Sequence, residues 1–328
     1  MGRPPLIVIA GPTAAGKSGL AVKLAGKISG SIISADSVQV YRGLDIGSAK
    51  ITGDEMRGIP HALIDVADPS EDFTVADYAP MAERAISEAA QKGYMPMLVG
   101  GTGFYIQAVV RGIRFDGDEG ADEDFRERMN SLSVEELYSR LREKDPDYAA
   151  QVHPHNRQRV IRALEYCEHT GETFSDYNRR EALRQDQYET AFYVLTDDRE
   201  KLYERIDRRA AYMVGNGLIE EVLALRKAGL TTNHQSMRTL GYRETMEALE
   251  AADRAGIAMP DKKALAEEIA LHTRHYAKRQ LTWFRREPQA AWFSLADMTQ
   301  EEIADAIVRD LREREIFHDR RALSTTQS

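Results

Sequence analysis

The stretch Gly11-Pro12-Thr13-Ala14-Ala15-Gly16-Lys17-Ser18 decides the fold of the N-terminal part of the chain. It follows an apolar run at residues 6–10 and precedes a helical pattern of apolar residues. This is the G-x-x-x-x-G-K-[ST] phosphate-binding loop, or P-loop, in its required place between a strand and a helix. Backbone N–H groups and the helix N-terminus bind the anion, Lys17 neutralises its terminal phosphate, and the hydroxyl of Ser18 reaches a magnesium ion. We therefore expect Mg2+ and a phosphate-bearing ligand, and a P-loop first suggests ATP.

Strand-like and helix-like segments alternate through the first hundred residues. The sequence predicts helices at residues 18–28 and 75–92 and apolar strands at residues 6–10, 31–34, 62–66 and 96–99. Continuously apolar strands separated by helices indicate a parallel sheet covered on both faces. The predicted fold class is therefore α/β, with a P-loop NTPase-like parallel sheet flanked by helices. Ligands bind beyond the carboxyl ends of such strands, which places the P-loop, Asp36 and residues 100–103 on one rim.

A helical region interrupts this alternation after an acidic stretch at residues 115–124. It contains a Ser-x-x-Glu capping box at Ser133 and Glu136, and it ends at a strand-like run at residues 190–195 that returns to the sheet. Long helical patterns follow. We predict a discontinuous α/β core at residues 1–116 and 190–316, an all-helical insertion domain at residues 117–189, and a polar tail at residues 317–328.

Composition excludes some classes of protein. The net charge of −9 argues against a general nucleic-acid binder, yet basic residues are concentrated at residues 153–162 and 274–286, and local fields decide where a polyanion docks. No apolar run reaches the roughly 18 residues of a membrane helix. The single cysteine, Cys167, lies in an apolar helical pattern, which favours a core thiol and excludes an intramolecular disulfide. We expect a cytoplasmic monomer with no membrane association.

Asp36 directly follows an apolar strand and is expected across the rim from Lys17. A carboxylate there suits a general base that takes a proton from an acceptor held near the phosphate loop. Asp36-Ser37 is also good helix-capping chemistry. The spacing leaves both interpretations open.

One feature of phosphate-hydrolysing P-loop enzymes is missing. Such enzymes carry an apolar strand that ends in an acid, which helps to hold magnesium. Here the strand at residues 95–99 ends in Gly100-Gly101-Thr102-Gly103, and Asp65 is the only other strand-end candidate. The absence disfavours a motor or switch NTPase. The glycines and the hydroxyl of Thr102 instead offer close approach to a substrate, although a tight strand–helix turn would look the same.

Three basic segments contain side chains of the kinds that bind nucleic acids. Residues 153–162 hold three arginines and two histidines without an acid, residues 238–243 pair arginines with a tyrosine around a glycine, and residues 274–286 interleave cations with aromatic side chains. Arginine and lysine neutralise phosphates, while aromatic rings stack on exposed bases. Solvated basic faces and helix turns give similar patterns, so each segment is ambiguous when taken alone.

Taken together, the motifs resemble the tRNA dimethylallyltransferase family, also called tRNA isopentenyltransferase, of the bacterial type. The resemblance rests on GPTAAGKS at 11–18, DSVQVYRGLDIGSAK at 36–50, LVGGTGFY at 98–105, HPHNRQRVIRALE at 153–165, RTLGYR at 238–243 and YAKRQLTWFR at 276–285. The set covers nearly the whole chain in the family's order. Ser18 and Ser48 stand where threonine is also common.

The resemblance implies that a dimethylallyl group passes from dimethylallyl diphosphate to N6 of the adenine just 3′ of the anticodon in tRNA. The P-loop, with Thr13 and neighbouring amides, would hold a diphosphate that leaves, which explains the missing strand-end acid. Asp36, Lys17 and Thr102 would be catalytic, and Mg2+ would bind Ser18. The insertion domain would contact the anticodon arm. The tRNA-binding residues implied are Asp36, Ser37, Val38, Gln39, Thr102, Gln158, Arg159, Val160, Ile161, Arg162, Arg238, Thr239, Leu240, Gly241, Tyr242 and Arg243.

Two other functions fit parts of the sequence. A nucleoside or nucleotide kinase would use the P-loop for ATP and Asp36 to deprotonate a hydroxyl, but it would not need the basic segments. A non-catalytic RNA-binding module would use the P-loop only as an anion site, but it would not need Asp36 on the same rim.

Overall fold

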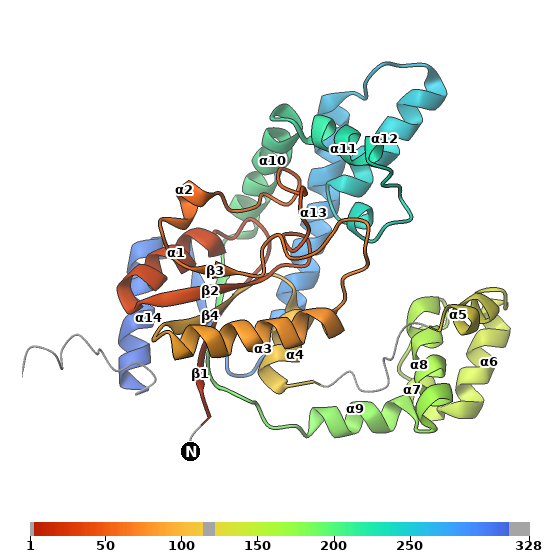
Figure 1. Ribbon diagram of the computed structural model, residues 1–328, viewed down its shortest axis with the longest axis horizontal. Coiled ribbons are helices and arrows are strands. Elements are labelled where there is room, and N and C mark those ends of the chain that lie inside the picture. Colours follow the sequence, from red (N-terminus) through yellow and green to blue (C-terminus); the bar gives the residue numbers. More distant parts are fainter. Residues whose placement is uncertain (1–2, 114–121, 315–328) are drawn as a thin grey trace, which may run out of the picture. The chain divides into compact units, whose positions relative to one another are not determined.

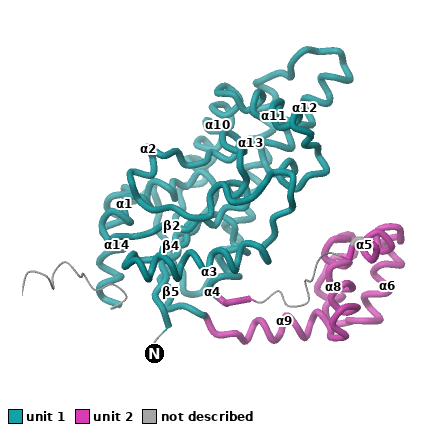
Figure 2. The backbone as a smooth tube through the Cα atoms, in the orientation of Figure 1, with its two compact units in different colours: residues 1–110, 187–328 teal, residues 111–186 magenta. Residues whose placement is uncertain are grey.

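The computed structural model describes residues 3–113 and 122–314. The chain divides into two compact units, residues 1–110 with 187–328 (unit 1) and residues 111–186 (unit 2), as Figure 2 shows. The sequence places the corresponding boundaries at residues 116 and 189. Most of the acidic stretch that suggested the first boundary, and the polar tail at residues 317–328, lie outside the described residues.

Unit 1 is built on a six-stranded parallel sheet with the order β3-β2-β4-β1-β5-β6 (Figure 1). The strands are β1 (Pro5–Ala10), β2 (Gly30–Ala35), β3 (His61–Ala62), β4 (Met95–Gly100), β5 (Glu189–Thr196) and β6 (Ala291–Ser294). Strand β5 follows unit 2 in the chain and returns to the sheet, as the sequence predicts, and it pairs with β1. The predicted α/β class with a parallel sheet flanked by helices is confirmed.

Helices cover both faces of the sheet. On one face, α1 (Lys17–Ile28) and α14 (Gln300–Glu313) share a buried apolar cluster with Ile7 and Ile9 of β1. Because side chains alternate along a strand, Leu6 and Val8 point to the opposite face. There lie α3 (Val75–Gln91) and α4 (Gly103–Arg111), and Figure 1 shows them across the sheet from α1 and α14.

A further group of helices completes unit 1. It comprises α10 (Arg199–Gly215), α11 (Leu218–Lys227), the short η1 (Ser236–Arg238), α12 (Tyr242–Ala255) and α13 (Lys262–Phe284), and α10 packs along α13. A short helix, α2 (Gly53–Met56), lies between β2 and β3 in the chain. No helix in the described part of the chain combines the length and apolarity needed to cross a bilayer.

Helices are the only regular elements among the described residues of unit 2. Its helices are α5 (Glu123–Asn130), α6 (Val134–Lys144), α7 (Pro146–Ala149), α8 (Arg157–Thr170) and α9 (Phe174–Ala182). The capping box at Ser133 and Glu136 is present at the start of α6, and Cys167 is buried. Unit 2 has an apolar core of its own, in which Leu137 and Val160 are fully buried.

The strand predicted at residues 62–66 is wrong beyond Ala62. Leu63 and Asp65 adopt left-handed backbone angles, with φ of 62° and 57°. An extended strand requires negative φ, so pairing with β2 stops at His61 and Ala62. Residues 63–65 instead form a bend, and the amides of residues 65–67 bond to the carbonyls of Gln39 and Val40.

Candidate functional site

Three loops leave neighbouring strands at the same level of the sheet. Gly100 at the end of β4 is in register with Ala10 of β1 on one side and with Ala35 of β2 on the other. The residues that follow these ends are Gly101, Gly11 and Asp36. Because parallel strands end on one edge, the P-loop, the Asp36 turn and the glycine-rich turn begin side by side.

A cavity of about 810 Å3 within unit 1 opens over these loops. Most of the candidate site residues of unit 1 line it: Thr13, Ala14, Gly16, Lys17, Ser18, Asp36, Ser37, Val38, Gln39, Arg238, Thr239, Leu240, Gly241 and Arg243. Gly11, Pro12, Ala15 and Tyr242 are buried behind its wall. The P-loop and the segment 238–243, far apart in sequence, therefore share one cavity.

The P-loop backbone explains its glycines. A Cβ at Gly11 would lie 2.3 Å from the carbonyl oxygen of Leu195, and Gly16 has a φ of 77° at the N-cap of α1. Both positions exclude ordinary side chains. The helix thus starts directly at Lys17, and its free N–H groups are suited to bind an anion.

The ammonium of Lys17 donates to the carbonyl oxygen of Pro12 at 2.7 Å. Burial lowers the pKa of Lys17 to about 8, the charge of Asp36 opposes this shift, and the nearby guanidinium of Arg209 adds to it. An anion that enters the cavity stabilises the protonated, positively charged form of Lys17.

Only one carboxylate oxygen of Asp36 caps the turn that follows it. Its Oδ1 accepts hydrogen bonds from the amides of Val38 at 2.9 Å and Gln39 at 3.2 Å, and these residues form a turn, not a helix. No hydrogen bond to Oδ2 is found among the described residues. The capping interpretation and the general-base interpretation are therefore compatible, because they use different oxygens of the half-buried carboxylate.

Thr102 supports the Asp36 turn. Its Oγ1 accepts from the amide of Ser37 at 3.1 Å and lies 3.3 Å from the hydroxyl of Ser37. Thr102 does not itself line the cavity. Its predicted contact with substrate stays a prediction, and the structure adds the hydrogen bond that links the glycine-rich turn to the turn after β2.

Gln280 is a site residue that the sequence reasoning missed. Its buried amide joins two loops: Oε1 accepts from the amide of Thr13 at 2.9 Å, and Nε2 donates to the carbonyl of Gly101 at 2.8 Å. The Thr13 amide, which the resemblance assigned to phosphate, is thereby occupied by Gln280. Near it, burial and the charge of Asp36 raise the pKa of Tyr276 to about 12. The only signal in the sequence was an uncharged amide within a basic, aromatic helix.

Two arginines of α10 also reach the P-loop side of the cavity. Nε of Arg205 donates to the carbonyl of Ala14 at 2.9 Å, and its Nη1 pairs with Asp197 at 2.5 Å. The buried Nη2 of Arg205 has no hydrogen-bond partner within the described residues. Arg209 donates to the carbonyl of Ser48 at 3.0 Å. Both line the cavity with Lys17, so its charge suits an anion.

The basic segment of unit 2 divides between surface and core. Val160 and Ile161 of α8 are buried in the core of unit 2, so their side chains face away from any external ligand, whereas Gln158 and Arg159 are exposed. Arg162 pairs with Glu165, with Nη1 3.6 Å from Oε2. Nothing in the structure of unit 2 tests its predicted contact with RNA.

The donor set for magnesium is small. Ser18 is exposed and lines the cavity. Asp65, the alternative acid, forms an ion pair of 2.5 Å with Lys50. No group of three or more acidic, histidine or cysteine side chains in residues 3–113 and 122–314 could hold a metal alone. These residues fit an ion that takes most of its ligands from phosphate and water, as Mg2+ does in phosphate sites.

Comparisons with known proteins agree on a family. The IPP transferase family model matches residues 39–287. The tRNA dimethylallyltransferase of Lachnoclostridium phytofermentans is 43% identical over 321 residues, covering 95% of this chain and 99% of that protein. The structure of the full-length tRNA isopentenylpyrophosphate transferase from Bacillus halodurans is similar, with a TM-score of 0.70, 40% identity, and coverage of 95% of this chain and 98% of that chain. A eukaryotic dimethylallyltransferase acting on tRNA gives a TM-score of 0.80 at 26% identity, covering 94% of this chain and 78% of that chain.

Proposed function

Because the chain belongs to the tRNA dimethylallyltransferase family of transferases, we propose that it transfers a dimethylallyl group from dimethylallyl diphosphate to N6 of the adenine 3′-adjacent to the anticodon in tRNA. The products are N6-dimethylallyladenosine in the tRNA and diphosphate. The observation that carries this proposal is the shared cavity, which is lined by Lys17, Ser18 and Asp36 and also, from the second half of the chain, by Arg238 and Arg243.

The P-loop side of the cavity binds the diphosphate. As the bond between carbon and the bridging oxygen breaks, negative charge develops on the leaving group, and Lys17, Arg205 and Arg209 are among the cations that line the cavity. Fixed cations stabilise such charge without reorganising. Mg2+ bound to the diphosphate oxygens and to Ser18 would supply further charge neutralisation. No strand-end acid is needed, because no water is activated at phosphorus.

Asp36 is the proposed general base. The adenine N6 lone pair is delocalised into the ring, so the amine is a weak nucleophile. N6 forms a bond to the first carbon of the dimethylallyl group, that carbon loses its bond to diphosphate, and the proton released from N6 passes to Oδ2 of Asp36. Oδ1 stays bonded to the amides of Val38 and Gln39, which fixes the carboxylate.

The adenine must leave the stacked anticodon loop to enter the cavity. Residues 36–39 line the part of the cavity next to the P-loop and are proposed to contact the base. Arg238 and Arg243 are proposed to neutralise nearby phosphates, and the exposed Gln158 and Arg159 of unit 2 to contact the anticodon arm. The family assignment favours this reaction over the kinase and over the non-catalytic RNA-binding module.

Incubation of the protein with Mg2+, dimethylallyl diphosphate labelled in the prenyl group, and an anticodon stem-loop RNA tests the proposal. Nucleoside analysis should show label on N6 of the adenine 3′ to the anticodon. The same RNA with guanine at that position is the matched control. Consumption of ATP without any labelling of RNA would instead support a kinase.

A further inference from the structure

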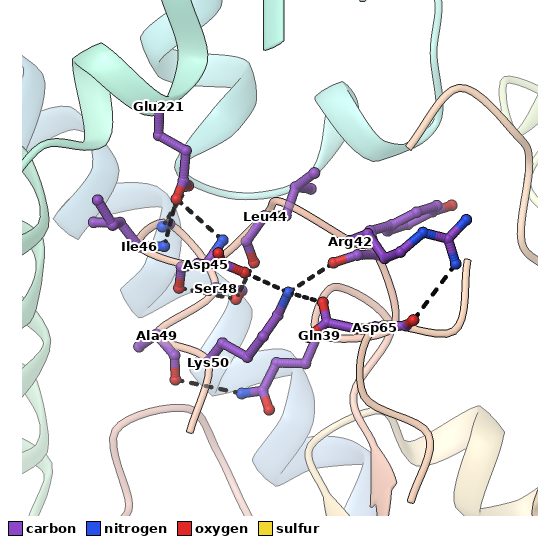
Figure 3. Close-up of polar contacts among 12 residues, drawn as sticks. Gln39, Arg42, Leu44, Asp45, Ile46, Ser48, Ala49, Lys50, Asp65 and Glu221 are labelled. Atoms are coloured by element: carbon purple, nitrogen blue, oxygen red, sulfur yellow. Dashed lines mark hydrogen bonds and ion pairs between the residues drawn. The ribbon is translucent and has the colours of Figure 1, made fainter. Parts of the chain in front are cut away.

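Residues 36–50, here called the acceptor loop, are held from outside the cavity by one carboxylate. Figure 3 shows Glu221 of α11 pointing at the backbone of this loop. Its Oε2 accepts from the amides of Asp45 at 3.1 Å and Ile46 at 2.8 Å, and its Oε1 accepts from the amide of Gly47 at 3.2 Å. Three consecutive amides therefore converge on a single side chain.

This arrangement is stronger than three ordinary hydrogen bonds. Hydrogen bonds to an ionised carboxylate are shorter and stronger than neutral ones, and consecutive amides that point at one centre form an anion-binding nest. Oε1 of Glu221 also accepts from the hydroxyl of the buried Tyr242 at 2.5 Å. Glu221 does not line the cavity, so it can affect a ligand only through the groups it holds, which are the loop and Tyr242.

Packing confirms that the loop sits tightly on these helices. A Cβ at Gly47 would lie 2.5 Å from Cε2 of the Tyr242 ring and 2.9 Å from a methyl carbon of Leu218. Only glycine allows the backbone to approach so closely. The loop is therefore fixed against the start of α11 and α12 by contact as well as by charge.

Further bonds join parts of the loop to one another and to Asp65. The ammonium of Lys50, whose side chain is 7% exposed, donates to the carbonyl of Tyr41 at 2.8 Å and pairs with Asp45 at 2.6 Å and Asp65 at 2.5 Å (Figure 3). The hydroxyl of Ser48 donates to the carbonyl of Leu44 at 2.6 Å. Nε2 of Gln39, in the turn that begins at Asp36, donates to the carbonyl of Ala49 at 3.5 Å, so these bonds connect residues 45–47 to that turn.

The loop carries one part of the proposed site and contacts another. Asp36 stands at its start, and the carbonyl of Ser48 accepts the guanidinium of Arg209 at 3.0 Å. Displacement of residues 45–47 would therefore shift both the proposed base and an arginine that faces the proposed diphosphate.

We propose that Glu221 is a positioning residue: its carboxylate fixes the acceptor loop and thereby sets the geometry of Asp36 and the direction of Arg209. The catalytic part of this inference rests on the proposed function. A simple contribution of Glu221 to overall stability is the competing explanation.

The test compares Glu221→Gln with Glu220→Gln. Glu220 is the neighbouring exposed residue of α11, so it is a matched control for the loss of one negative charge. In the Gln variant only one oxygen remains for four donors. Amide hydrogen exchange in a peptide covering residues 43–50 should quicken about tenfold or more, while exchange in β1 stays unchanged. Affinity for inorganic diphosphate with Mg2+ should fall about tenfold.

A double-mutant cycle separates positioning from stability. If Glu221 acts through Arg209, Glu221→Gln should weaken diphosphate binding much less in an Arg209→Gln background. Turnover should fall about a hundredfold in Glu221→Gln, with the KM for tRNA changed less than about twofold. Tyr242→Phe removes one donor to Glu221 and leaves three, so it should show the same effects at smaller size. It replaces Glu221→Gln in these measurements if that variant does not fold.

Unchanged exchange at residues 43–50, or additive effects of the two substitutions on diphosphate affinity, would overturn the proposal. The exchange and diphosphate measurements need no prenyl transfer. If the wild-type protein modified no tRNA, the proposed function would fail while these measurements still decided whether Glu221 positions the loop.

Discussion

Gln280 Oε1 accepts a hydrogen bond from the backbone amide of Thr13, 2.9 Å away, across 267 residues of sequence. Helix α13 therefore reaches the P-loop directly. Because Nε2 of the same side chain donates to the carbonyl of Gly101, one buried amide ties the phosphate loop to the turn after β4. The two loops that bracket the site thus depend on a residue of the last basic segment.

Replacement of Gln280 by Glu tests this link. The variant keeps an acceptor for Thr13 but loses the donor to Gly101 and adds a negative charge beside the phosphate site. We expect diphosphate affinity to fall about tenfold or more, and the free energy of unfolding to fall by about 1–3 kcal/mol because a buried carbonyl loses its partner. Isothermal titration and urea unfolding measure the two effects. Gln289→Glu, the same change at an exposed position, should alter neither.

Binding of diphosphate should depend on pH through Lys17. The pKa of Lys17 is lowered to about 8, and only its protonated form attracts the anion. Affinity is therefore complete below pH 8 and falls by about tenfold per pH unit above it, until the higher pKa of Lys17 in the complex is reached. Titrations between pH 7 and 9.5 measure this slope. The slope should flatten in Lys17→Met, which corrects for titration of diphosphate itself, and equal slopes in both proteins would refute the role of Lys17.

Two glycines should respond oppositely to alanine. A Cβ at Gly100 would lie 2.0 Å from the carbonyl oxygen of Ala35 and would force β2 and β4 apart at the rim of the site. We expect Gly100→Ala to lower the free energy of unfolding by about 1–3 kcal/mol or more. Gly26 lies inside α1 with nothing within 4 Å of its Cβ position, so Gly26→Ala should raise it by about 0.5–1 kcal/mol. Urea unfolding of both variants decides, and a neutral Gly100→Ala would contradict the close strand approach.

Neighbouring arginines at the start of α8 should separate stability from RNA binding. Nη2 of Arg157 donates to the carbonyls of Met129, Asn130 and Leu132, whereas Arg159 is exposed. Arg159→Ala should leave unfolding unchanged, weaken binding of an anticodon stem-loop, and reduce the salt slope of that binding by about one.

Arg157→Ala is the matched comparison for this prediction. It should lower the stability of the protein, because three carbonyls lose one shared donor. If Arg159→Ala left the affinity and its salt dependence unchanged, the proposed contact of this segment with RNA would be refuted.

The parts of the site that local sequence determines could be predicted. The P-loop motif and the apolar strands fix which residues end each strand, and parallel pairing then brings Gly11, Asp36 and Gly101 to one edge. The capping box at Ser133 is equally local. The same kind of signal was available at Thr299 and Glu302, which form the capping box of α14, but that helix was not predicted.

The parts that were missed depend on contacts between distant segments. Gln280 contacts Thr13 and Glu221 contacts the acceptor loop through the tertiary packing of α13 and α11, and nothing near either residue in the sequence indicates these partners. The strand expected at residues 62–66 failed for a related reason. The ion pair of Asp65 with Lys50, which holds the turn there, joins residues that no periodic pattern connects.

The most direct test of the central claim is single-turnover prenyl transfer to an anticodon stem-loop by Asp36→Asn. Asparagine can keep the Oδ1 bonds to Val38 and Gln39, so the turn survives while the base is lost. The account predicts a rate about 10²–10⁴-fold below that of the wild-type protein, with binding of the stem-loop and of diphosphate nearly unchanged. Transfer at the wild-type rate would contradict the account and would leave Asp36 as the cap of a turn.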